Sequence, residues 1–200
     1  MKKIFLFSLV ITIFCSCAYF NTFYNANQYY DEATKIRLEK DGQAVPIQAM
    51  DKYGKAIEKC MKVLRDFPQS RFYNDAILLM AKAQYFRSDY SLALDNLTEI
   101  LNNGSENQVE EAKYWQALCK WKKGNLQTSM NELKFLLTNS TSKSILSKCH
   151  LTLAEISSEL INPDSSLFHL KKAAKITQNR DEKGVIYGRL AELAFELEQY

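Results

Sequence analysis

The chain has 200 residues, 46% of them hydrophobic and 24% charged, which is enough to bury a core. Its 26 basic and 23 acidic residues give a net charge of +3, and Lys2 and Lys3 supply most of that excess. A charge this close to neutral, without a long basic run, argues against nucleic acid as the main partner because phosphate binding needs clustered Lys and Arg.

The N-terminus has the pattern of an exported protein. Lys2 and Lys3 precede an apolar run, Ile4–Phe14, which is too short to span a bilayer as a helix. This pattern predicts a signal peptide over residues 1–16. The alternatives are an uncleaved N-terminal anchor and an ordinary secretory signal that is cut elsewhere.

The end of this segment resembles the lipobox of bacterial lipoproteins. Ser16 places a small residue directly before Cys17, although Phe14 and Cys15 stand where the motif usually has leucine and a small aliphatic residue. The resemblance implies that Cys17 is the first mature residue and the lipid attachment site. Several acyl chains would hold the protein stably on a membrane. Apart from this covalent lipid we expect no cofactor.

Three further cysteines, Cys60, Cys119 and Cys149, lie far apart in the sequence. They form no CxxC pair and have no metal-ligand spacing, so no metal site is expected. We expect buried thiols that act as small hydrophobic side chains. A disulfide, which an oxidising compartment would allow, is the alternative.

Residues 17–45 should form an aromatic-rich N-terminal helix and loop. Six of the twelve residues from Tyr19 to Tyr30 are aromatic, which is too many for one helical stripe. We expect most of them to pack against the rest of the protein. The lipid interface or a partner is the alternative for the others.

From residue 46 to residue 200 one pattern recurs four times: a first residue, a small residue three positions later and a larger residue four positions after that. The copies are Tyr53/Ala56/Cys60, Tyr90/Ala93/Leu97, Leu126/Ser129/Leu133 and Pro163/Ser166/Leu170. The first positions are spaced by 37, 36 and 37 residues. The small residue lets two helices approach closely, so each copy predicts a helical hairpin that must stack on its neighbours.

Helical periodicity and turn residues together predict an all-α chain. The expected helices are Asn21–Glu39, Ile47–Arg65, Ser70–Arg87, Tyr90–Asn102, Ser105–Lys122, Leu126–Thr138, Ser142–Leu160, Asp164–Gln178 and Asp181–Glu198.

The spacing and residue types of the four copies resemble the tetratricopeptide repeat, whose second helix carries a Tyr-x-x-Ala-x-x-x-Phe core. The resemblance covers Tyr53–Tyr200 and implies a solenoid of about four and a half helical hairpins. The period here exceeds the usual 34 residues or so, and the segment Asp66–Phe72 is where the extra residues lie, as an extended turn.

The segments Val63–Phe72 and Asp89–Ala93 are similar to the repeat variant found in lipoproteins of the BamD type, which take part in inserting β-barrel proteins into the outer membrane. The resemblance implies a periplasm-facing outer-membrane lipoprotein that binds envelope proteins or extended peptides. Ala18 fits this location, because aspartate after the lipidated cysteine is the usual inner-membrane retention signal. Glycan or nutrient capture and the coordination of peptidoglycan or division are the alternatives.

Repeat geometry would place one set of residues in a groove lined by the first helix of each hairpin. The candidate partner-binding residues are Lys82, Tyr85, Tyr114, Leu118, Trp121, Leu151 and Glu155. Rigid aromatic rings suit the capture of an extended peptide or a helix. The alternative is that Tyr85, Tyr114 and Trp121 pack between helices.

No group of residues predicts catalysis, and we expect a protein that is not an enzyme. His150 and His169 appear isolated on separate helices, and no nucleophile, base and orienting group form a recognisable motif.

Overall fold

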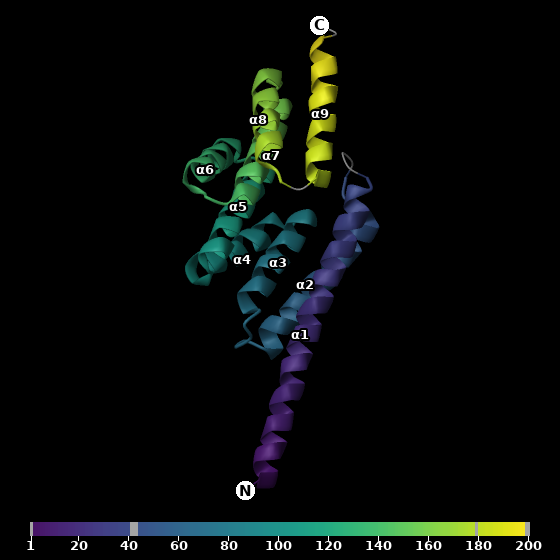
Figure 1. Ribbon diagram of the computed structural model, residues 1–200, viewed down its shortest axis with the longest axis vertical. Coiled ribbons are helices and arrows are strands. Elements are labelled where there is room, and N and C mark those ends of the chain that lie inside the picture. The colour runs from purple at the N-terminus through teal and green to yellow at the C-terminus, as the bar shows by residue number, and fades with distance from the viewer. Residues whose placement is uncertain (1, 41–43, 179, 199–200) are drawn as a thin grey trace. The chain divides into compact units, whose positions relative to one another are not determined.

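The computed structural model describes residues 2–40, 44–178 and 180–198, and the regular structure of these ranges is entirely α-helical (Figure 1). This confirms the all-α fold class. The nine helices of the described ranges are α1 (Lys2–Leu38), α2 (Ile47–Asp66), α3 (Tyr73–Phe86), α4 (Tyr90–Asn103), α5 (Glu106–Lys122), α6 (Leu126–Asn139), α7 (Lys143–Glu159), α8 (Pro163–Ile176) and α9 (Arg180–Glu198).

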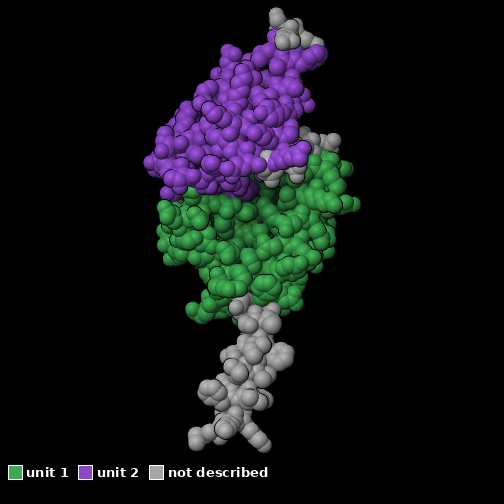
Figure 2. Space-filling model, in the orientation of Figure 1, with its two compact units in different colours: residues 1–112 green, residues 113–200 purple. Residues whose placement is uncertain are grey.

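The chain divides into two compact units, residues 1–112 (unit 1) and residues 113–200 (unit 2), and the division falls inside α5 (Figure 2). In unit 1, α1 packs on α2, α2 on α3 and α3 on α4. In unit 2, α6 packs on α7, α7 on α8 and α8 on α9. The predicted series of consecutive helical hairpins is therefore confirmed within each unit.

The second helix of each hairpin buries the residues of the repeated pattern. The small residues Ala56, Ala93, Ser129 and Ser166 are at most 1% exposed, and the larger residues Cys60, Leu97, Leu133 and Leu170 are at most 4% exposed. Burial of these pairs is what a close helix–helix approach requires, since the small residue sets the separation and the larger one fills the space one turn on.

The first helices of the hairpins are joined to one another. In unit 1, α1 packs on α3, and a hydrogen bond connects α3 to the beginning of α5. In unit 2, hydrogen bonds connect the remainder of α5 to α7, and α7 to α9. Each unit thus contains a layer of first helices, which is the layer where the candidate binding residues lie.

Three turns between the two helices of a hairpin share one backbone geometry. Ser88, Gly124 and Ile161 occupy equivalent repeat positions and have φ values of 66°, 87° and 53°. In each turn the amide of the next residue donates to a carbonyl five residues earlier, at 2.9 Å. This hydrogen bond closes the helix end in the left-handed conformation that glycine adopts most easily.

Two helix starts differ from the prediction by more than one residue. Helix α1 begins at Lys2 instead of Asn21, because no proline or glycine occurs before residue 41 to interrupt it. Helix α3 begins at Tyr73 instead of Ser70, because the Ser70 hydroxyl accepts a hydrogen bond from the Phe72 amide (3.1 Å) and stabilises a turn instead. Among the described residues, no helix is both long and apolar enough to span a bilayer.

The prediction of buried thiols is confirmed. Cys60, Cys119 and Cys149 all carry thiols that are in no disulfide bond, and all three are 0% exposed. Burial raises the pKa of Cys60 to about 12 and that of Cys119 to about 12, so both stay protonated and act as small apolar side chains.

Substitutions at two equivalent turns should change stability in opposite directions. Ile161→Gly relieves a branched residue in the left-handed region and should raise the free energy of unfolding by about 1 kcal/mol. The Ile161 side chain is 90% exposed, so little packing is lost. Gly124→Ala should lower the free energy of unfolding by about 1 kcal/mol. Urea unfolding followed by circular dichroism measures both, and changes of the same sign would contradict the turn geometry.

Candidate partner-binding surface

In unit 1, Lys82 on α3 is held in place by two neighbouring helices. Its ammonium group donates to a Glu111 carboxylate oxygen on α5 at 3.0 Å and lies 5.6 Å from the centre of the Tyr30 ring on α1. The Lys82 and Glu111 side chains are 22% and 27% exposed. Both charges are therefore fixed in position and still partly accessible to a partner.

Tyr85 lies one turn further along α3 and is only partly buried. Its ring centre is 5.2 Å from that of Phe86 and 5.6 Å from that of Tyr90. These contacts fix the orientation of the ring, while its accessible part gives the surface of α3 a rigid, amphipathic aromatic group.

In unit 2, three of the predicted groove residues are buried. Tyr114, Leu118 and Trp121 on α5 are only 6–7% exposed. The hydroxyl groups of Tyr114 and Thr152 on α7 are 3.0 Å apart and share a hydrogen bond. Tyr114 therefore connects α5 to α7, as the packing alternative predicted.

Trp121 also connects α5 to the end of α7. Its indole N–H donates to a Glu159 carboxylate oxygen at 3.0 Å, and Lys122 forms an ion pair with the same carboxylate at 3.7 Å. The Lys122 ammonium group lies 3.5 Å from the centre of the Trp121 ring. Trp121 is therefore covered by a charged pair, of which Glu159 is the more exposed member.

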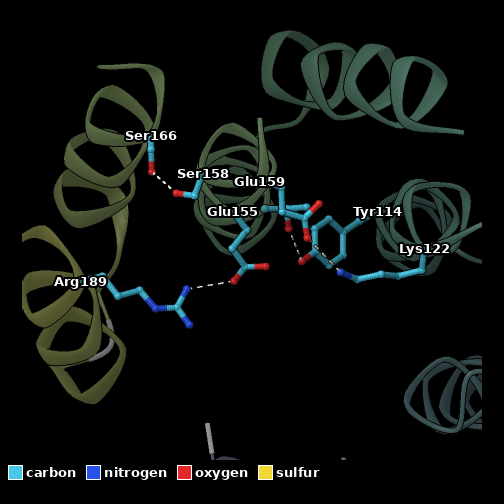
Figure 3. Close-up of polar contacts among 8 residues, drawn as sticks. Tyr114, Lys122, Glu155, Ser158, Glu159, Ser166 and Arg189 are labelled. Carbon is cyan, nitrogen blue, oxygen red and sulfur yellow. Dashed lines mark hydrogen bonds and ion pairs between the residues drawn. The ribbon is translucent and has the colours of Figure 1, made fainter. Parts of the chain in front are cut away.

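Leu151 and Glu155 lie on α7 and keep part of their surface accessible. Leu151 packs against the core cluster that contains Ala154 and Leu170. The Glu155 carboxylate accepts a hydrogen bond from the Arg189 guanidinium group on α9 at 2.9 Å (Figure 3). The Glu155 side chain is 47% exposed and the Arg189 side chain is 35% exposed, so this ion pair is open to solvent.

Of the seven predicted residues, the accessible ones are thus Lys82 and Tyr85 in unit 1 and Leu151 and Glu155 in unit 2. The structure adds two charged residues to the predicted binding set, Glu111 and Arg189. Which side chains meet across neighbouring first helices depends on the direction of each side chain, which the sequence pattern does not determine. Partly exposed ion pairs beside apolar groups can exchange their contacts for those of a charged or extended partner. Partner binding itself stays a prediction.

The prediction that the two histidines are isolated is wrong. His150 on α7 and His169 on α8 have their Nδ1 atoms 2.9 Å apart. In such a contact one ring donates and the other accepts, so a single proton lies between them. Their separation of 19 residues spans a helical hairpin, and only the geometry of the intervening turn brings them together. Within the described residues, no three potential metal ligands gather around this pair or elsewhere.

The surroundings of this pair favour neutral rings. Burial, followed by the charges of His169 and Lys172, lowers the pKa of His150 to about 4. Burial and the neighbouring Lys134 also lower the pKa of His169. The lowered pKa values favour uncharged rings near neutral pH, and an uncharged ring supplies the acceptor nitrogen that the shared hydrogen bond requires.

The protein should become easier to unfold as the pH falls from about 6.5, the ordinary pKa of histidine, toward about 4. In this window the unfolded chain binds protons that the folded chain excludes, so the free energy of unfolding decreases with falling pH. In the double variant His150→Gln/His169→Gln, the free energy of unfolding should lose the part of its pH dependence that the two histidines cause. Urea midpoints measured above and inside the window test this, and equal losses in both proteins would contradict it.

No protein-family model matches this chain, and no curated protein sequence is similar enough to count as a relative. What the chain does is therefore inferred from its own residues and their geometry.

Proposed function

We propose that this chain is a lipoprotein attached through Cys17 to the periplasmic side of the outer membrane, where its helical repeats bind envelope proteins. The specific process proposed is the assembly of β-barrel outer-membrane proteins, as the resemblance to lipoproteins of the BamD type implies. Extended peptides of such client proteins are the ligands whose chemistry suits the first helices. The side chain of Cys17 lies outside the described part of the structure.

The observation that carries this proposal is the accessible polar and aromatic surface along the first helices. Lys82 and Tyr85 lie within one turn of each other on α3, and Leu151 and Glu155 do so on α7. Each place pairs an apolar group with a partly exposed charge. At each place, taken by itself, an extended peptide could therefore combine backbone or side-chain hydrogen bonds with apolar contacts.

Within each unit, contacts between neighbouring helices support the accessible residues. Tyr114 and Trp121 hold α5 and α7 together through hydrogen bonds at 3.0 Å, and Lys82 connects α3 with α5. A binding surface whose side chains are already fixed loses less conformational entropy when a partner binds. Repeat proteins use the layer that their stacked hairpins present for this purpose.

Photo-crosslinking in living cells tests the partner. A benzophenone amino acid at Tyr85 or at Leu151 should capture an outer-membrane assembly protein or an unfolded barrel precursor. The matched control is Phe135 on α6, which is 57% exposed but belongs to a second helix. We expect no specific product there. Capture of a polysaccharide from Tyr85 and Leu151, or of the same proteins from all three positions, would contradict the proposal.

Metabolic labelling with a fatty-acid analogue tests the anchor. The wild-type chain should incorporate the label, and Cys17→Ser should abolish incorporation because the thioether bond cannot form. Cys15→Ser changes a cysteine only two residues away and should leave labelling intact. Label that persists in Cys17→Ser, or is lost only in Cys15→Ser, would place the lipid elsewhere.

A further inference from the structure

Two aromatic side chains near the start of the described side chains are unusually exposed. Phe20 is 53% and Tyr24 is 54% exposed, and both lie on α1. They are four residues apart, which places them on the same helix face, and their stacked rings have centres 6.4 Å apart. The helix thus presents a continuous aromatic surface to solvent.

The turn between α2 and α3 packs beside these residues. The Phe72 ring centre is 6.1 Å from that of Phe20 and 5.0 Å from that of Phe23. The Arg71 guanidinium group lies 4.7 Å from the centre of the Phe72 ring, and the Arg71 side chain is exposed. We call Phe20, Tyr24, Phe72 and Arg71 the aromatic collar.

The collar adjoins a segment with an excess of positive charge. From Lys62 to Phe72 the chain has three basic side chains and one acidic side chain, Asp66. Asp66 is already engaged by Arg65, with an N–O distance of 2.7 Å. Val63 belongs to the core cluster against which both Leu64 and Phe23 pack, so this segment lies at the same end of α1.

The collar is close to position 17 along the same helix. Because α1 is continuous from Lys2 to Leu38, Phe20 lies about 4.5 Å and Tyr24 about 10 Å beyond residue 17 along the helix axis. Spacings of three and seven residues also put all three positions on one helical stripe. The headgroup layer of a bilayer is about 5–7 Å thick on each side, so a lipid on Cys17 would bring Phe20 into it, and a tilt of α1 toward the membrane plane would bring Tyr24 there as well.

We propose that the aromatic collar inserts into the headgroup layer of the membrane that holds the lipid of Cys17. This inference rests on the lipid anchor of the proposed function. Phenylalanine and tyrosine are favourable at this depth, where the ring contacts acyl chains and a tyrosine hydroxyl reaches water. Arg71 and its basic neighbours face anionic headgroups, which attract them. Unit 1 therefore lies directly on the bilayer surface instead of at the end of a flexible tether.

Tryptophan fluorescence in vesicles tests the depth of the collar. The full lipidated chain, with Phe20→Trp, is reconstituted into phosphatidylethanolamine–phosphatidylglycerol vesicles that contain a brominated phospholipid, which quenches nearby indoles. The matched control is Phe168→Trp, because Phe168 is equally exposed (52%) but lies on α8 in unit 2. Both variants retain the buried Trp115 and Trp121, so the background is the same.

Quenching should be at least about twofold greater for Phe20→Trp than for Phe168→Trp if the collar lies in the headgroup layer. Equal quenching of the two variants, or none in either, would overturn the inference for a chain whose mass shows lipid on Cys17. A mass without that lipid would instead contradict the anchor of the proposed function, and the collar with it. The two failures are therefore distinguishable.

Discussion

The close approach of neighbouring helices at one small residue per hairpin is the constraint on which the rest of the structure depends. Ala56, Ala93 and Ser129 occupy this position and are completely buried. Among the described residues, the Ser129 hydroxyl has no hydrogen-bond partner, so this position requires small size and not polarity. A larger side chain would separate the helices and open the contacts of the first-helix layer, including the 3.0 Å bond between Tyr114 and Thr152.

The same constraint explains why the core was predictable from sequence. A period of 36 to 37 residues fixes which positions must be buried, and Leu97 and Leu133 are indeed 0% exposed. The backbone conformation of the turns was harder to predict. A glycine such as Gly124 indicates a left-handed residue, whereas Ser88 and Ile161 adopt the same conformation although their residue types do not favour it. The backbone there is imposed by the hairpin, which overrides the local preference of the side chain.

The candidate surface was only partly predictable, because the rotation of a helix about its own axis decides what faces solvent. Tyr114 and Trp121 lie on the predicted helix but point toward α7, whereas Tyr85 stays partly accessible. A rotation of a few tens of degrees separates these outcomes, and the period of the hydrophobic pattern does not determine it that finely. The contact between His150 and His169 depends on the same rotations of α7 and α8.

Helix α1 connects the proposed anchor to the repeats because it belongs to both. Removal of residues 1–16 would leave the helix supported, since Ala26 and Ala33 are completely buried against α2 and α3 through two core clusters. Phe23 and Tyr30 extend these contacts along the helix. A lipid on Cys17 would thus be attached to a helix that is itself part of the packed core. Movement of unit 1 relative to the bilayer would then require tilting this helix, which favours a fixed distance between the membrane and the Lys82 surface on α3.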